Sequence, residues 1–249
     1  MVLVHSDLIP PDKTSQANLD WADWKTEYTV IQSLKANGYQ VQIIGLDNDL
    51  KILDQALEEH KPSIIFNLLE EFQDEAVFDQ HVVSYLELKG IPYTGCGPRG
   101  LTISRDKAVT KMLLQHSGIQ TPDFCVVPKG AAPAKSLNLT YPMIVKSLVE
   151  EASLGISQSS VVTNREKLEE RVRFIHESIN TDALIEEYVE GRELYVGVLG
   201  NRQLKVLPPW ELFMGSLKKE GYPIATRNIK FSKSYNAKHR IKRGLARGI

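Results

Sequence analysis

The sequence predicts an α/β protein in which an amino-terminal, mostly parallel sheet is followed by an α+β unit. Three short apolar runs near the amino terminus alternate with two helical patterns, and this alternation is typical of βαβ units. Farther along the chain the pattern changes to short strands, small-residue loops and one long helix. No GxGxxG signature follows the first apolar run, which disfavours a dinucleotide-binding Rossmann domain. Ligands of such a sheet are expected beyond the carboxyl ends of its strands.

Composition and charge exclude several classes of protein. The chain has 249 residues, of which 42% are hydrophobic and 24% charged, as in ordinary globular proteins. A net charge of -1 gives no overall basic excess for nucleic-acid binding, although the last dozen residues, KHRIKRGLARGI, are locally basic. Cys96 and Cys125 have neither disulfide-framework nor zinc-site spacing. With no signal peptide or membrane span in the sequence, we expect a cytosolic protein.

The predicted parallel sheet uses the first ninety residues. Its polar candidates follow the strands, with His5 after the first, Asp47 after the second and Asn67 to Glu71 at the end of the third. Gly38 is expected to end the first helix as a C-cap residue. The expected strands are residues 2–4, 41–44 and 63–69, and the expected helices are residues 24–37, 50–59 and 78–89.

The next segment is rich in glycine and proline. Residues 90–100, GIPYTGCGPRG, predict turns, with close approach of the backbone to a ligand as the alternative reason for the glycines. A helix is expected over residues 104–116, and strands over 124–127 and 141–146, the latter ending in Lys146. The loop that follows contains Gly155 and is suited to folding over an anion. Asn164 is expected to cap a helix that extends to about Ser178.

Residues 183–199, ALIEEYVEGRELYVGVL, predict two strands joined as a hairpin by a short polar connection. Carboxylates are dense here, and a buried strand avoids unpaired charge because it costs several kcal/mol. One interpretation is that the backbone of residues 186–189 binds a planar base while Glu193 accepts hydrogen bonds from a ribose diol. The other is a solvent-exposed hairpin edge with charged residues that block edge pairing. This stretch alone leaves both open.

Four motifs in fixed order resemble the ATP-grasp ligases. They are RDK at 105–107, PMIVK at 142–146, a Ser/Gly loop at 153–157 and EEYVEGRE at 186–193. Within these ligases the chain is most similar to the D-alanine:D-alanine ligase branch, on the segments FNLLEE, YLELKGIPYTG, DKAVTK and IEEYVEGREL. The resemblance implies a pre-ATP-grasp domain at 1–100, a central ATP-grasp subdomain at 101–182, and the start of a catalytic subdomain at 183–249.

The resemblance implies that ATP binds along these motifs. Lys107 and Lys146 match lysines at the α- and β-phosphates, although either one taken alone is better explained as a solvated lysine. Lys238, in SYNAKHR, matches a catalytic lysine on a mobile loop that reaches the γ-phosphate. Without the resemblance, that basic stretch would be interpreted as a disordered tail. The other implied nucleotide-binding residues are Ser153 and Gly155 over the triphosphate, Glu186, Glu187 and Val189 at adenine, and Glu193 at the ribose.

The resemblance also implies the reaction. A substrate carboxylate attacks the γ-phosphate to give an acyl phosphate, and the amine of a second substrate opens it to form an amide. The implied partners are small amino-acid-like substrates, with no nucleic acid and no membrane, and a homodimer is allowed.

Two departures limit the carry-over. In the family, the Mg²⁺ ligands and an arginine that stabilises the transferred phosphoryl group lie beyond the mobile loop, whereas this chain stops at Ile249. We therefore expect a carboxy-terminally incomplete ligase that is inactive alone. We assign no metal ligand. The amino-terminal stretch HSDLIPPDKT does not match the family's substrate loop. Glu70, Ala152 and His239 replace a family histidine, serine and tyrosine. A ligase for other amino acids or peptides and a catalytically dead ATP-binding regulator therefore remain as alternatives.

Overall fold

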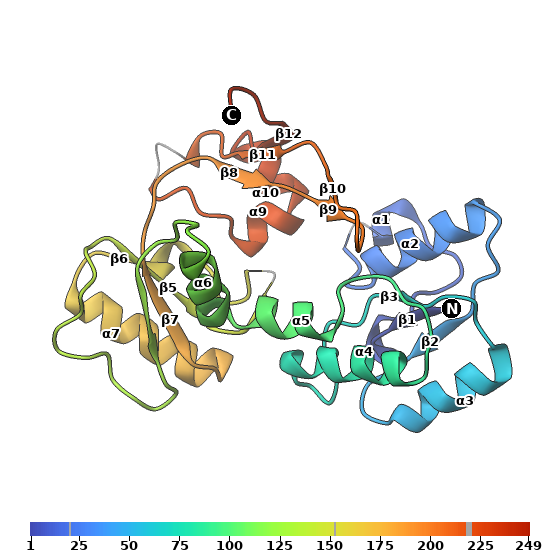
Figure 1. The fold of residues 1–249 in the computed structure, drawn as a ribbon. Coiled ribbons are helices and arrows are strands. Elements are labelled where there is room, and N and C mark those ends of the chain that lie inside the picture. Colours follow the sequence, from blue (N-terminus) through green and yellow to red (C-terminus); the bar gives the residue numbers. More distant parts are fainter. Residues whose placement is uncertain (20, 152, 218–220) are drawn as a thin grey trace. The chain divides into compact units, whose positions relative to one another are not determined.

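The computed structural model describes residues 1–19, 21–151, 153–217 and 221–249, so the predicted substitution at Ala152 lies outside the described residues. The chain forms two compact units, Met1–Asp106 and Lys107–Ile249 (Figure 1). We describe each unit by itself.

The first unit contains the predicted parallel sheet. Strands β1 (Val2–Val4), β2 (Ile43–Gly45) and β3 (Phe66–Asn67) lie in the order β2-β1-β3, and both neighbours run parallel to β1. Because side chains alternate along a strand, Leu3 packs into one core while Val2 and Val4 pack into another with Ile31. The helices of this unit are η1 (Ser6–Leu8), α1 (Gln16–Leu19), α2 (Lys25–Ala36), α3 (Leu50–His60), η2 (Ala76–Phe78), α4 (Asp79–Leu88) and α5 (Pro98–Arg105).

The prediction for residues 90–116 is partly wrong. The structure has two helices, α5 and α6 (Lys107–His116), separated by Asp106 in an extended conformation. Helix α5 begins inside the predicted turn segment because Pro98 occupies its first turn, where the missing N–H of proline costs nothing. Gly95, with φ of 101°, keeps the predicted turn before it.

The second unit has a four-stranded antiparallel sheet between helices. Its strands are β4 (Phe124–Val127), β5 (Met143–Ser147), β6 (Val161–Val162) and β7 (Ala183–Glu187), in the order β4-β7-β5-β6. One face packs on α7 (Arg165–Phe174) and the π-helical turn η4 (Ile175–Ile179) through Val145 and Ile185, and the other packs on α6 through Leu184. Asn164 caps α7 as predicted, accepting a hydrogen bond from the Lys167 N–H.

The rest of this unit forms a smaller sheet with its own core. The strands β8 (Glu193–Tyr195), β11 (Trp210–Phe213) and β12 (Lys242–Leu245) are antiparallel in the order β12-β11-β8, and β9 (Val198–Leu199) pairs with β10 (Lys205–Val206). Leu212, Met214 and Leu217 pack with Ile229 and Ile241. The remaining helices are η3 (Gln158–Ser160), α9 (Arg227–Phe231) and α10 (Lys233–Lys238).

Two sequence-based interpretations are corrected here. The predicted hairpin at 183–199 does not form, because β7 is bonded on both edges by β4 and β5 while β8 pairs with β11. The disordered-tail alternative is also wrong, since the basic end of the chain forms α10 and β12. The three-part division stays a proposal, and because β7 belongs to the central sheet we place its second boundary after β7.

Candidate functional site

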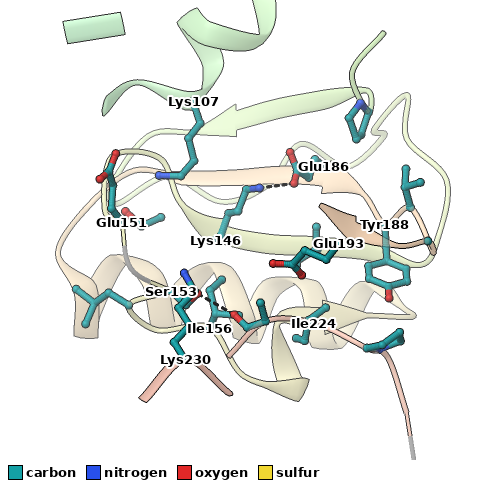
Figure 2. Close-up of a pocket in the computed structure, with 18 of the residues that line it drawn as sticks. Lys107, Lys146, Glu151, Ser153, Ile156, Glu186, Tyr188, Glu193, Ile224 and Lys230 are labelled. Atoms are coloured by element: carbon teal, nitrogen blue, oxygen red, sulfur yellow. Dashed lines mark hydrogen bonds and ion pairs between the residues drawn. The ribbon is translucent and has the colours of Figure 1, made fainter. Parts of the chain in front are cut away.

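The second unit contains a cavity of about 620 Å³, a volume within the range of small-molecule sites. Its walls come from the β4-β7-β5-β6 sheet, the loop after β5, the start of β8 and residues 223–230 (Figure 2). The predicted site residues that line it are Lys107, Lys146, Ser153, Glu186, Glu187, Val189 and Glu193. Gly155 and Lys238 are not among its lining residues.

Strand register places Lys146 and Glu186 together. Ile144 lies directly opposite Glu186 on the neighbouring strand, so Lys146, two residues farther along β5, is the diagonal neighbour of Glu186 on the same face. Their side chains form an ion pair. Glu186 is only 7% exposed and lies in an inner strand, which excludes the exposed-edge interpretation for this residue.

The same carboxylate contacts a second lysine that the sequence analysis missed. Lys111 Nζ lies 3.0 Å from Glu186 Oε2, and its side chain is 11% exposed. Lys111 follows Lys107 by one helical turn on α6, and this i, i+4 spacing was the signal that could have identified it. One buried carboxylate therefore lies between two ammonium groups.

The side chain of Lys107 is hydrogen-bonded to the first residues of the loop that follows β5. Its Nζ donates to the carbonyl oxygens of Leu148 at 3.1 Å and Glu150 at 2.6 Å. In Figure 2 the ammonium group of Lys146 meets Glu186, that of Lys107 is turned toward the loop after β5, and Lys230 of α9 lies on the opposite side of the cavity. Lys230 was not predicted, because a helix of only five residues gives little hydrophobic periodicity. Three lysines thus surround one end of the cavity.

The end of β7 and the residue after it are held by hydrogen bonds that the sequence did not predict. The backbone N–H groups of Glu187 and Tyr188 donate to Asp123 O at 3.0 Å and Pro142 O at 2.9 Å. The Glu187 carboxylate accepts from both the hydroxyl and the backbone N–H of Thr140, and these bonds lower the pKa of Glu187. Backbone contacts to a ligand are therefore expected at Val189, which is 68% exposed and lines the cavity.

Glu193 begins β8 and lies at the opposite end of the cavity from Lys107 (Figure 2). Its Oε1 accepts a hydrogen bond from the Tyr195 hydroxyl. Burial, followed by this bond, raises the pKa of Tyr195 well above its usual value, so the tyrosine stays a neutral donor that orients the carboxylate. Glu193 thus presents an oriented acceptor to the cavity.

The loop after β5 is hydrogen-bonded both to Ala225 and to Arg171 of α7. Ser153, with φ of 66°, donates from Oγ to Ala225 O at 2.7 Å. Gly155, with φ of 70°, packs against Ile179, where an added Cβ would lie 3.0 Å from Cδ1. The Gly155 carbonyl accepts a hydrogen bond from Arg171. Gly155 therefore anchors the loop to Ile179 and Arg171 without lining the cavity.

Lys238 is the last residue of α10 and is exposed. The structure does not bring it to the cavity, so its catalytic role stays a prediction.

No helix in the described part of the chain is long and apolar enough to cross a membrane.

Comparison with known proteins gives a consistent result. A family model described as D-ala D-ala ligase C-terminus matches residues 113–244. An uncharacterized protein y4sG of Sinorhizobium fredii is 32% identical over 200 residues, which are 78% of this chain and 58% of that protein. A D-alanine–D-alanine ligase of Desulforudis audaxviator is 32% identical over 186 residues, or 74% of this chain and 58% of the ligase. The chain thus spans 58% of the length of each of these curated relatives.

The solved structures agree on the fold. The D-alanine–D-alanine ligase from Bacillus anthracis, complexed with ATP, superposes with a TM-score of 0.65 at 20% identity and covers 100% of this chain and 82% of that one. A VanG D-Ala:D-Ser ligase from Enterococcus faecalis gives 0.58 at 19% identity over 85% of this chain and 69% of that one. The predicted fold class, a parallel-sheet domain followed by an ATP-grasp domain, is confirmed.

Proposed function

The chain belongs to the D-alanine–D-alanine ligase family of ATP-grasp enzymes, and on that premise we propose that it binds ATP in the cavity of its second unit as part of an ATP-dependent ligase. The ligase joins the carboxylate of one amino acid to the amine of another. D-Alanine is the first candidate for both substrates, because the curated relatives include enzymes named for it.

The observation that carries the proposal is the polarity of the cavity. Lys107, Lys146 and Lys230 lie at one end, beside Glu151 and the Lys146-bound Glu186, and Tyr188 and Glu193 lie at the other (Figure 2). A triphosphate fits the cationic end, since compact ammonium groups complement phosphate oxygens. The other end offers an aromatic ring and a carboxylate acceptor, which suit a base and a ribose.

The residues at the cationic end act by position and charge. Phosphoryl transfer to a carboxylate spreads charge over the equatorial oxygens of the γ-phosphoryl group, so preorganised cations lower the barrier. The carboxylate attacks the γ-phosphorus, ADP leaves, and the resulting acyl phosphate is opened by the amine with release of phosphate. Lys107 and Lys146 hold the α- and β-phosphates during these steps.

The proposal includes Mg²⁺ as the companion of ATP. This ion is usually held by one or two carboxylates together with the phosphates of the substrate, and it supplies further neutralisation of phosphate charge. Within the described residues, the one cluster of three ligand side chains is His5, Glu71 and Asp74 in the first unit. Glu150 and Glu151 line the cavity near Lys107 and are the carboxylates that would contact a phosphate-bound ion there.

The proposal is tested with the purified chain, ATP, Mg²⁺ and either D-alanine or a panel of L- and D-amino acids. Calorimetry measures ATP binding, and mass spectrometry detects dipeptide alongside released phosphate. We expect ATP binding, and, in line with the expectation of a chain that is inactive alone, no amino-acid-dependent dipeptide. Absence of ATP binding contradicts the proposal, and dipeptides formed only from other amino acids would identify a different ligase of the same family.

We expect Glu193→Ala to weaken ATP binding about tenfold and to abolish any preference for ATP over 2′-deoxy-ATP. A carboxylate that accepts from both ribose hydroxyls loses part of its binding energy when one is absent, and charged hydrogen bonds contribute roughly 1.5–3 kcal/mol. Calorimetry with both nucleotides measures the preference. Glu190→Ala is the matched control, because Glu190 is exposed and does not line the cavity. An unchanged preference in Glu193→Ala would show that this carboxylate does not bind the ribose.

A further inference from the structure

We propose that Lys111, which does not line the cavity, is a positioning residue that sets the charge available to the phosphates. It does so by pairing with the second oxygen of Glu186, so that Lys111, Glu186 and Lys146 together carry one net positive charge. The inference rests on the proposed ATP site and adds to it a residue outside the cavity wall.

The contacts of Lys111 fix its ammonium group behind Glu186. Its Nζ lies 3.0 Å from Glu186 Oε2, donates to Pro122 O at 3.0 Å, and lies 5.4 Å from the centre of the Phe124 ring. The side chain is 11% exposed, and that of Glu186 is 9% exposed. Both charges are therefore poorly screened by water.

The two oxygens of Glu186 are divided between two lysines. Oε1 pairs with Lys146, which faces the cavity, and Oε2 pairs with Lys111, which does not. Two ammonium groups and one carboxylate leave one net positive charge, and Lys146 is the member of the set that a ligand reaches. If Lys111 were neutral, Glu186 and Lys146 would form a neutral pair, and Lys146 would attract phosphate much less.

This arrangement predicts different effects on ligands with and without phosphate groups. ATP and ADP carry phosphates that interact with the net charge, whereas adenosine has none. Loss of Lys111 is thus expected to weaken ATP binding while leaving adenosine binding nearly unchanged. A role limited to packing α6 against the sheet would affect both ligands to a similar extent.

The test is a double-mutant cycle with Lys111→Met, Glu186→Gln and the double variant, using calorimetry with ATP and with adenosine. Glutamine keeps the shape of Glu186 and removes its charge. We expect Lys111→Met to raise the Kd for ATP about tenfold, or about 1.4 kcal/mol, and that for adenosine less than twofold. The double variant restores the net charge of the wild type, so its Kd for ATP is expected within about threefold of wild type.

Lys167→Met is the matched control, since Lys167 is exposed on α7 and does not line the cavity. Lys111→Gln, which keeps a donor for Pro122 O, serves as a second variant with the same expected loss if methionine prevents folding. Two results overturn the inference: ATP affinity within twofold of wild type in Lys111→Met and Lys111→Gln, or no recovery in the double variant. Absence of ATP binding by the wild-type chain instead contradicts the proposed function, so the two failures are distinguishable.

Discussion

Replacing Lys146 with alanine is expected to weaken ATP binding about 10- to 100-fold while changing adenosine binding less than twofold. A hydrogen bond from an ammonium group to a charged oxygen contributes roughly 1.5–3 kcal/mol, and about 1.4 kcal/mol corresponds to a factor of ten. The variant also leaves the Glu186 carboxylate facing the phosphates without Lys146 beside it. Repulsion from this carboxylate adds to the loss.

Calorimetric titration with ATP, ADP and adenosine measures the effect. The loss should be large for both phosphate-bearing ligands and absent for adenosine. Lys167→Ala is the control for a general loss of positive charge, because Lys167 is exposed on α7 and does not line the cavity. Equal ATP affinity of Lys146→Ala and wild type would remove Lys146 from the site.

Local sequence patterns predicted the parts of this site that depend on strand alternation. In β5, Met143 and Val145 pack on the α7 side, so Lys146 had to share the opposite face with Ile144. The motifs placed both Lys146 and Glu186 in one nucleotide site, at the phosphates and at adenine respectively, but they did not predict that the two side chains would pair. The register of β5 against β7 made the two diagonal neighbours, and that register is a tertiary property.

What the sequence could not predict was which strands would pair. Residues 183–199 have the local pattern of a hairpin, yet β7 is bonded between β4 and β5, and β8 joins a different sheet. Hydrophobic alternation identifies a strand but not its partner, because hydrogen-bonding groups are the same along every strand. Lys230 was missed for a related reason, since a short helix is positioned by its contacts and not by its own periodicity.

We expect the largest effect on stability from Arg105→Met in the first unit. The Arg105 guanidinium donates to Asp79 Oδ2 at 3.0 and 2.8 Å, and to the carbonyl of Glu70. The two side chains are 9% and 5% exposed. Removing one partner of a buried ion pair leaves the other charge without compensation and costs about 3–5 kcal/mol. Asp79 is the first residue of α4, whose helix dipole stabilises a carboxylate, so a value near the lower end is expected.

The free energy of unfolding of the first unit is measured by urea denaturation, followed by tryptophan fluorescence. The measurement uses a Trp210→Phe background, because the two remaining tryptophans, Trp21 and Trp24, both lie in the first unit. Arg99→Met is the control, because Arg99 is exposed on the same helix, and it should change stability by less than about 0.5 kcal/mol. Adding Asp79→Asn to Arg105→Met removes the uncompensated charge and should recover about half of the loss or more, since the penalty comes mainly from the isolated carboxylate. A loss below about 1 kcal/mol in Arg105→Met, or a double variant as unstable as the sum of the two single variants, would show that the pair is not a major source of stability in the first unit.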